Sequence, residues 1–260
     1  MSRGGRKGSR GETFGGVHAV AAVLERAPER VKRLQLATGS LEPPLQALLE
    51  RAGACGVTVE RVGRERLDQQ QPGFQHQGVI VHCSARPVVG EAELLERIAA
   101  GLDLVLVLDG VTDPHNLGAC LRTADAAGAG AVVTTRHRSA ALTPAAIKVA
   151  SGAAETVPVV SVPNLARTLA ALKQGGMWIT GLDGAAQQDL YDVDLRPPSA
   201  IVMGAEGEGM RRLTREACDH RVRIPMQGAV ESLNVSVATG VTLFEVLRQR
   251  RGTAGAGQAG

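Results

Sequence analysis

Aromatic residues and paired cysteines are scarce in this chain of 260 residues. It has three Phe, one Tyr and one Trp, so Val, Leu, Ile and Ala must fill its cores. The cysteines, Cys55, Cys83, Cys120 and Cys218, are scattered without a C-x-x-C pair. This spacing argues against a disulfide framework or zinc site and predicts reduced, buried thiols. We therefore expect a functional site that holds no metal.

Long hydrophobic runs are also missing. No segment is apolar enough to span a membrane, and no apolar region follows the charged start to make a signal peptide. These features predict a cytoplasmic protein. The net charge of +3 is modest but uneven, because Arg3, Arg6, Lys7 and Arg10 precede the first acidic residue. Such an arm is typical of a disordered tail, which either is merely solvated or screens phosphates.

Composition divides the chain into two α/β units. Residues 12–84 form a small unit, and residues 101–252 form a larger one. Residues 85–100 connect the two units. The stretch Ser84–Gly90, which contains Pro87, predicts a linker, and Glu91–Ala100 predicts a helix that leads into the second unit. We expect residues 1–11 and 253–260 to be disordered tails. In the small unit the pattern predicts helices over His18–Arg26 and Leu45–Ala52, and strands over Leu34–Ala37, Val57–Val62 and Gly78–Cys83.

The larger unit alternates strand and helix patterns, which predicts a parallel sheet with helices on both faces. The first strand is a continuous apolar run of the kind buried on both faces. The predicted strands are Leu104–Asp109, Ala131–Thr134, Val157–Val160, Met177–Gly181, Ala200–Met203 and Val222–Ile224.

The first candidate motif follows the strand Leu104–Asp109. A turn leads into a helix that we expect to start near Asn116, with Arg122 six residues later among small residues. Asn116 is either a helix N-cap or a ligand-binding residue. The small neighbours of Arg122 favour a long cation with a fixed target over a solvated helix face.

The second motif is the strand Ala200–Met203 with its glycine-rich loop. Gly204, Gly207 and Gly209 allow positive φ and close backbone approach to a ligand, and Glu206 stands among them. The order G-x-x-G-x-G is not the dinucleotide order G-x-G-x-x-G, and no phosphate-binding G-x-x-x-x-G-K-[ST] occurs. The alternative to a ligand loop is an ordinary surface loop.

The third motif comes after Ile224-Pro225-Met226. The stretch Ser232–Thr242 opens a predicted helix that runs to Arg251, with Ser-Leu-Asn in its first turn. Its apolar residues Leu233, Val237, Val241 and Phe244 recur at helical spacing, so they predict one face for the core or for a subunit contact.

As a set, these motifs resemble those of the SpoU family of RNA ribose 2′-O-methyltransferases, in the SPOUT superfamily. The first motif is Asn116, Arg122 and Gly128, and the second is Gly204, Glu206 and Gly209. The third joins Ile224-Pro225-Met226 to Ser232–Ala238. The stretches Phe14–Val20 and Gln75–Val79 also look like the family's substrate-binding domain, which resembles ribosomal RNA-binding proteins. This layout is similar to that of bacterial enzymes that methylate a guanosine ribose in the peptidyl-transferase region of 23S ribosomal RNA.

The resemblance implies a deep trefoil knot in the parallel-sheet domain, a homodimer built through that domain, and S-adenosylmethionine as methyl donor. The cofactor would lie in a bent shape among the loops after three strands. The implied cofactor-binding residues are Thr180, Gly181, Leu182, Gly204, Ile224, Met226 and Leu233.

The resemblance also implies the catalytic set. Arg122 would act on the ribose hydroxyl, as a base or by stabilising alkoxide charge; a guanidinium rarely gives up its proton, which favours stabilisation. Asn116, Glu206, Ser232 and Asn234 would orient Arg122 and the ribose. Methyl transfer from a sulfonium needs no metal.

Other functions compete with 23S ribosomal RNA methylation. The chain could methylate transfer RNA or a ribosomal site that confers antibiotic resistance, or it could be a non-catalytic ribosome-assembly factor. The intact catalytic set argues against the last of these. In the small unit, Arg64, Arg66 and Gln69–Gln71 are candidate RNA contacts, and we expect no DNA or membrane partner.

Overall fold

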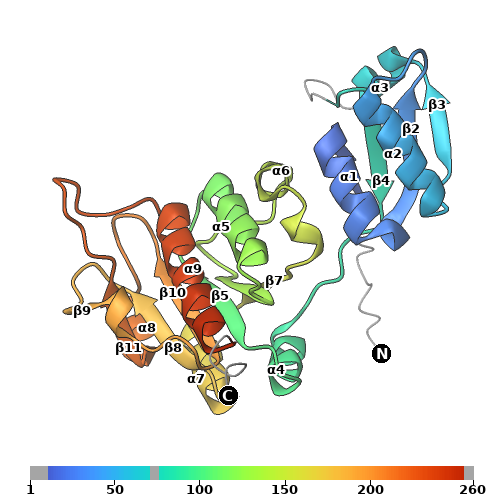
Figure 1. Ribbon diagram of the computed structural model, residues 1–260. Helices are drawn as coiled ribbons and strands as arrows, with labels where there is room; N and C mark the ends of the chain where they lie inside the picture. Colours follow the sequence, from blue (N-terminus) through green and yellow to red (C-terminus); the bar gives the residue numbers. More distant parts are fainter. Residues whose placement is uncertain (1–10, 71–75, 255–260) are drawn as a thin grey trace. The chain divides into compact units, whose positions relative to one another are not determined.

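The computed structural model describes residues 11–70 and 76–254, so the predicted tails lie largely outside the described residues. The chain forms two compact units, Met1–Pro87 and Val88–Gly260, and each is described by itself (Figure 1). At the C-terminal end, the last helix continues to Ala254, two residues into the segment predicted to be a disordered tail.

The first unit is built on a mixed sheet of four strands. They are β1 (Glu12–Gly15), β2 (Val31–Ala37), β3 (Val59–Val62) and β4 (Val79–Cys83), in the order β1-β4-β2-β3. Strand β4 pairs antiparallel with β1 and β2, whereas β2 and β3 are parallel. The three predicted strands are present with shifted ends, and β1 is an element that the sequence analysis missed.

Three helices accompany this sheet: α1 (Val17–Arg26), α2 (Pro43–Ala54) and α3 (Arg64–Gln70). Helix α1 contacts β1, β4 and α2, and buries Val20, Val23 and Leu24. Helix α3 was not predicted. It places Leu67 against Val62 and Ile80 in a small cluster of its own.

The second unit contains a sheet of seven strands, in which every neighbouring pair is parallel. The order is β7-β6-β5-β10-β8-β11-β9. The predicted parallel sheet is confirmed; β9 was missed, and several strand ends differ by one or two residues. The strands are β5 (Leu104–Asp109), β6 (Ala131–Thr135), β7 (Val159–Val162), β8 (Trp178–Leu182), β9 (Gln188–Asp189), β10 (Ser199–Gly204) and β11 (His220–Arg223).

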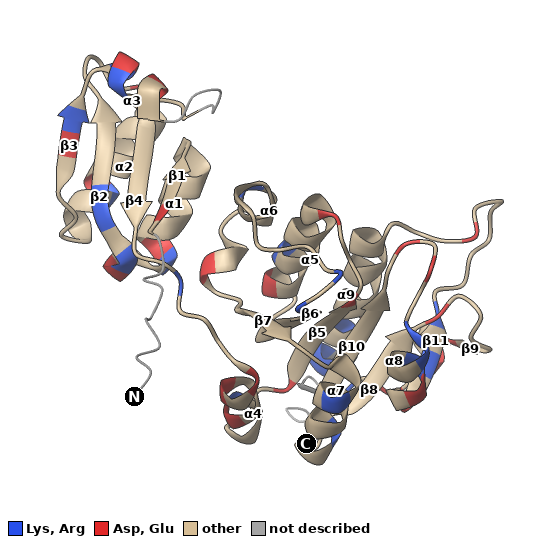
Figure 2. Cartoon of the chain, turned by 180° about the vertical axis from the view of Figure 1, so that it is seen from behind, with Lys and Arg blue, Asp and Glu red and all other residues tan. Residues whose placement is uncertain are grey.

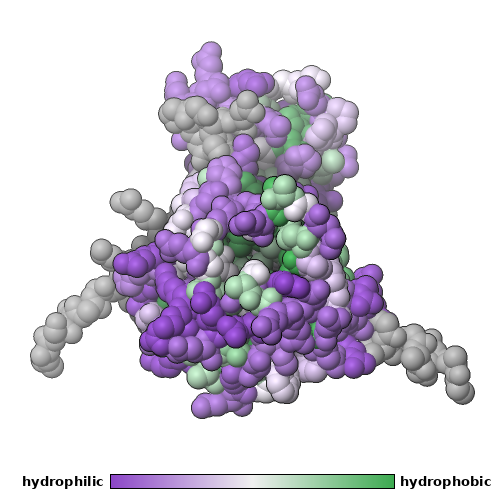
Figure 3. Space-filling view, turned by 90° about the vertical axis from the view of Figure 1, so that its left-hand side faces the viewer, coloured by the Kyte–Doolittle hydropathy of each residue, from purple (hydrophilic) through white to green (hydrophobic). Residues whose placement is uncertain are grey.

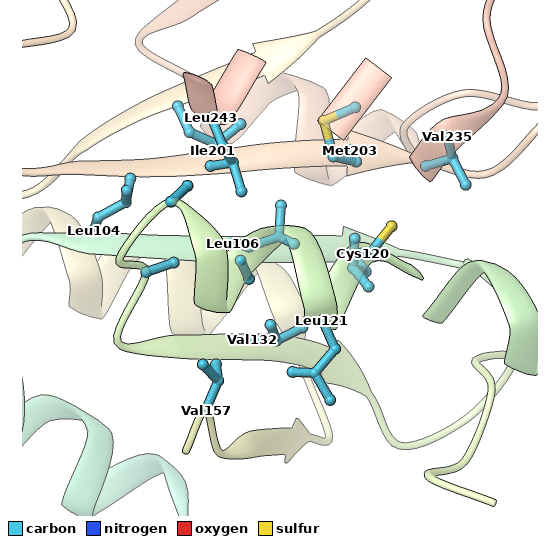
Figure 4. Close-up of a cluster of buried hydrophobic side chains, with 14 of the residues drawn as sticks. Leu104, Leu106, Cys120, Leu121, Val132, Val157, Ile201, Met203, Val235 and Leu243 are labelled. Carbon is cyan, nitrogen blue, oxygen red and sulfur yellow. The ribbon is translucent and has the colours of Figure 1, made fainter. Parts of the chain in front are cut away.

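Helices cover both faces of this sheet, because alternate residues of its central strands point to opposite sides. Leu104, Leu106 and Leu108 of β5 join one core with residues of α5 and α9, as Figure 4 shows for part of the cluster. Val105 and Val107 join the other core, with residues of α4 and α7. The helices are α4 (Glu91–Ala99), α5 (Pro114–Ala126), α6 (Pro144–Ala150), α7 (Leu165–Gln174), α8 (Arg212–Ala217) and α9 (Val235–Ala254).

Helix α9 returns from the β11 side of the sheet to lie against α5 and β10. Its buried face carries Thr239, Thr242, Leu243 and Val246. Of the predicted apolar face, Val241 packs against this core, whereas Val237 and Phe244 are 51% and 48% exposed, so a subunit contact for these two stays a prediction. Hydroxyls fit the core here because Thr239 and Thr242 donate to carbonyls one turn earlier.

On the face drawn in Figure 3, hydrophobic residues show as small separate patches in a largely purple surface. Within the described ranges, no helix is both long and apolar enough to cross a membrane. The 20 residues of α9 carry several charges, and a hydrogen bond from Gln249 to the Val193 carbonyl ties its last turns to the chain before β10.

Candidate functional site

Most residues of the predicted site lie at the ends of three neighbouring strands, at one edge of the sheet. Strands β10, β8 and β11 lie side by side and run parallel, so their carboxyl ends meet at the same edge. The loops that leave this edge are residues 183–187, 205–211 and 224–234; they contain or adjoin the predicted cofactor-binding residues except Thr180 and Gly181, which lie within β8. Open parallel sheets bind ligands at this edge.

A polar cluster forms around Glu206. Its Oε1 accepts hydrogen bonds from Asn116 Nδ2 at 3.1 Å, Asn234 Nδ2 at 2.6 Å and the Val235 backbone N–H at 3.3 Å. Asn234 Nδ2 also lies 3.1 Å from Asn116 Oδ1. Residues that are far apart in the sequence and belong to three predicted motifs thus meet at one carboxylate.

Asn234 also caps helix α9. Its Oδ1 accepts from the Ser236 backbone N–H at 2.9 Å and from the Ser236 hydroxyl at 2.6 Å. The helix begins at Val235, so the predicted first turn Ser-Leu-Asn is wrong: Ser232 and Leu233 lie in the segment before it. Glu206 supplements this cap from another loop, because it accepts the Val235 amide, one of the helix's orphan donors.

Asn116 is not the cap of α5. The helix begins at Pro114, and the carboxylate of Asp113 accepts from the His115 backbone N–H at 2.9 Å. An Asp followed by a proline at the first helical position is a common helix start, and this signal was overlooked. Relieved of capping, the Asn116 side chain is available to the Glu206 cluster.

The glycine-rich loop is held by a close backbone contact. Ala205 and Gly209 form a two-residue bridge with N···O distances of 3.1 and 2.9 Å. A Cβ on Gly204 would lie 2.2 Å from the carbonyl carbon of Gly209, so only glycine fits there. Gly209 has φ 69°, in the left-handed region. The loop is therefore a defined turn, not an arbitrary surface loop.

Asp109 fixes the far end of the same loop, and the sequence analysis missed it. This residue ends β5, is 1% exposed, and pairs in register with Gly204. Its Oδ2 accepts the Arg211 backbone N–H at 2.8 Å, and its Oδ1 lies 3.5 Å from Arg211 Nη1. A charged residue at the end of an otherwise apolar strand was the available signal.

Arg122 and Ser232 lie outside this network. Arg122 is exposed, and its Nη1 donates to the Ser151 hydroxyl at 3.4 Å. Six residues separate Arg122 from Asn116 on α5, which is about 9 Å along the axis and roughly 120° around it. Ser232 is exposed in the segment before α9. The cluster of Asn116, Glu206 and Asn234 is thus preformed within one chain, whereas Arg122 points elsewhere.

The predicted cofactor-binding residues differ in what they expose. Thr180 is 1% exposed and Gly181 is buried, and both are paired with β10 on one side and β11 on the other. A Cβ on Gly181 would lie 2.6 Å from Cys218 Sγ. Leu182, Gly204, Ile224, Met226 and Leu233 are partly exposed at the carboxyl edge.

The thiols of the unit are shielded rather than reactive. Burial raises the pKa of Cys120 to about 11, and burial likewise raises the pKa of Cys218 to about 11. Cys55 is exposed, so the expectation that all four thiols are buried is wrong. In the part of the chain that the structure describes, no group of three His, Cys, Asp or Glu side chains could hold a metal ion.

Comparison with known families identifies both units. The description "SpoU rRNA Methylase family" matches residues 103–244, and "RNA 2′-O ribose methyltransferase substrate binding" matches residues 15–89. The chain belongs to the SpoU rRNA methylase family. The first match contains every residue of the Glu206 cluster.

Individual relatives in this family cover nearly the whole chain. The 23S rRNA (guanosine-2′-O-)-methyltransferase RlmB of Pseudomonas syringae is 57% identical over 92% of this chain and 96% of that protein. RlmB of Haemophilus influenzae is 52% identical over 93% of this chain and 99% of that protein.

Solved structures agree on the fold. A crystal structure of an RNA 2′-O ribose methyltransferase has a TM-score of 0.74 at 27% identity, over 93% of this chain and 90% of the other. AviRb from Streptomyces viridochromogenes, solved with AdoMet, has a TM-score of 0.76 at 24% identity, over 96% and 95% of the two chains.

Proposed function

We propose that this protein transfers a methyl group from S-adenosylmethionine to the ribose 2′-hydroxyl of a guanosine in 23S ribosomal RNA. The observation that carries the proposal is the similarity to RlmB over more than nine tenths of the chain. The preformed cluster of Asn116, Glu206 and Asn234 supports an enzyme rather than a non-catalytic assembly factor, because a binding-only protein has no need of it. A ribosomal RNA substrate agrees with the predicted cytoplasmic location.

The carboxyl edge of β10, β8 and β11 is the proposed cofactor pocket. Bound S-adenosylmethionine would supply a methyl group already activated on a sulfonium. Thr180 and Gly181 would form one wall of the pocket within β8, and the backbone at Gly204 would offer hydrogen bonds from the end of β10. The partly exposed side chains of Leu182, Ile224, Met226 and Leu233 would offer apolar contact. An adenine ring needs both kinds of contact. The tight turn at Gly204 allows the backbone to approach a ligand without a Cβ in the way.

Arg122, Asn116, Glu206, Ser232 and Asn234 are the proposed catalytic set. A guanidinium does not give up its proton near neutral pH, so the proposed role of Arg122 is to bind phosphate and to stabilise the negative charge that develops on the ribose oxygen. Glu206 holds Asn116 and Asn234 in place, and these amides orient the ribose. Ser232 lies before the start of α9 and its hydroxyl is exposed, so it can change orientation to contact the ribose.

The proposal includes a homodimer, and the position of Arg122 supports it. Within one chain the guanidinium of Arg122 does not join the Glu206 cluster, because Arg122 and Asn116 project from different sides of α5. A second copy could bring its own Arg122 to this cluster. Val237 and Phe244, half exposed on α9, offer apolar surface for such a contact. The path of α9 back across the sheet is compatible with the family's trefoil knot, which we include in the proposal.

The first unit is the proposed RNA-binding domain. Of the predicted contacts, Arg64 and Arg66 are exposed on α3, and Arg61 is exposed on β3; Figure 2 shows both basic and acidic residues on these two elements. Exposed cations of this kind attract phosphates in a salt-dependent way. Of the other predicted contacts, Gln69 and Gln70 are exposed on α3, and Gln71 lies outside the described residues.

Two measurements test the proposal. Calorimetry with a chelator present should show S-adenosylmethionine binding to the full chain, and a need for a divalent ion would contradict the pocket. Incubation with labelled S-adenosylmethionine and 23S ribosomal RNA, followed by mapping of 2′-O-methyl groups, should show one modified guanosine. Transfer RNA serves as the competing substrate. Methylation of transfer RNA alone, or of another ribosomal site, would select an alternative substrate, and binding without transfer would select the assembly factor.

A further inference from the structure

We infer that Ser151 is a positioning residue that holds the guanidinium of Arg122 for methyl transfer, and this inference rests on the function proposed above. Ser151 belongs to none of the three motifs that define the site. It follows directly after α6, and its hydroxyl is 3.4 Å from Arg122 Nη1.

One face of α5 sets the distance between these two residues. Gly118, Arg122 and Asp125 lie four and three residues apart, so they share this face. A Cβ on Gly118 would lie 2.4 Å from the Ala146 carbonyl oxygen, so glycine lets the α6 backbone come close. At the other end, the hydroxyl of Thr156 donates to the carboxylate of Asp125. The close approach at Gly118 is what brings the end of α6 near Arg122, whereas the contact between Asp125 and Thr156 adds stability one turn further along α5.

The Ser151 hydroxyl has a defined orientation. It donates its proton to the Val149 carbonyl oxygen at 3.3 Å, which leaves its lone pairs to accept from Arg122. Arg122 is the donor that needs such a group, because it is exposed and its long side chain would otherwise sample several rotamers.

The backbone at Ser151 argues that its side chain is there for a purpose. Ser151 has φ 50° and ψ 43°, a left-handed conformation that is uncommon for residues other than glycine. Glycine would fit this helix end without strain, as Gly152 does at φ 93°. A serine at this position supplies an acceptor for Arg122, although glycine would adopt the left-handed conformation with less strain.

The test separates positioning from folding. Ser151→Gly removes the hydroxyl and relaxes the backbone, so its melting temperature should equal or exceed that of the wild type. Its kcat with ribosomal RNA should nevertheless fall about tenfold or more, with KM for S-adenosylmethionine unchanged. The matched control is Thr156→Val, which loses the contact to Asp125. It should melt at a lower temperature and keep kcat within about twofold, because it leaves the Arg122 contact intact.

A double mutant completes the test. Arg122→Ala combined with Ser151→Gly should be no slower than Arg122→Ala alone, because Ser151 acts through Arg122. Multiplied losses in the double mutant, or wild-type kcat in Ser151→Gly, would overturn the inference while leaving the proposed function standing. A wild-type protein that transfers no methyl group would reject the proposed function, and the inference with it.

Discussion

Asn234 Nδ2 lies 2.6 Å from Glu206 Oε1, across 28 residues of sequence. The same oxygen receives Asn116 and the first amide of α9. One carboxylate therefore joins the glycine-rich loop, helix α5 and the start of the last helix. Because this oxygen accepts from three donors at once, we expect the negative charge of Glu206 to strengthen these hydrogen bonds.

Glu206→Gln should weaken the hydrogen bonds that join the glycine-rich loop to α5 and to the start of α9. The variant removes the charge and turns part of the acceptor into a donor, so we expect at least a tenfold slower methyl transfer and a free energy of unfolding lower by about 1–2 kcal/mol. Glu208→Gln, an exposed carboxylate in the same loop, is the matched control and should behave as the wild type. Urea unfolding and a methyl-transfer assay measure both effects. Equal results for the two variants would show that the Glu206 cluster is incidental.

Gly204→Ala should damage the cofactor pocket by steric overlap. Its Cβ would meet the Gly209 backbone at 2.2 Å, so the bridge from Ala205 to Gly209 must open. Overpacking of this kind costs about 1–3 kcal/mol, and we expect S-adenosylmethionine to bind about tenfold more weakly or worse. Gly184→Ala, in the loop after β8, meets nothing within 4 Å and should bind normally. Titration calorimetry distinguishes them, and unchanged affinity in Gly204→Ala would place the pocket elsewhere.

Arg122→Ala should affect chemistry and not cofactor binding. The guanidinium is proposed to act on the ribose oxygen and the neighbouring phosphate, and the loss of such a stabiliser costs about a hundredfold or more in rate. The dissociation constant of S-adenosylmethionine should stay within a few-fold. Single-turnover methylation and calorimetry on the same preparation check both statements. A nearly wild-type rate would remove Arg122 from the mechanism.

The sequence predicted the sheet well because its strands carry their own signal. Leu104–Asp109 is apolar on both faces, and its bounds were predicted as the structure has them. Short or polar elements carry no such signal. Strand β9 has two residues and pairs only with β11, and α3 is held by the single buried Leu67. Both elements exist because of contacts that are distant in the sequence.

The site was predicted in part for a similar reason. Its members could be named from the motifs, but which side chains meet could not. The hydrogen bonds of Glu206 span 28 and 90 residues, and nothing local predicts them. Asp109 was overlooked because its partner, Arg211, lies 102 residues away. The buried side of α9 was not predicted, because it mixes Thr239 and Thr242 with Leu243 and Val246, and threonine gives no apolar signal.

Glu245 links stability to pH. Hydrogen bonds from Arg248 lower the pKa of its carboxyl, burial opposes this, and Gln249 lowers it further. A depressed pKa contributes stability above the ordinary glutamate pKa of about 4.3, and this contribution is lost as pH falls through the folded-state pKa. Glu245→Gln should therefore unfold at a lower urea concentration than the wild type at pH 7, and the difference should shrink as the pH falls below the ordinary glutamate pKa of about 4.3. A difference that does not shrink as the pH falls would assign the effect to packing.

Removing the first unit should separate RNA choice from cofactor binding. The cut belongs before Val88 and not at the predicted helix start Glu91, because Val89 is 6% exposed and belongs to the same core as Leu94 and Ile98. The truncated protein keeps the whole parallel sheet and α9, so it should stay folded, bind S-adenosylmethionine and remain dimeric. It should lose most of its affinity for ribosomal RNA and the salt dependence that phosphate contacts confer. Light scattering and filter binding at two salt concentrations measure these properties. Full RNA affinity in the truncated protein would remove the RNA-binding role of the first unit, and a monomer would remove α9 as the subunit contact.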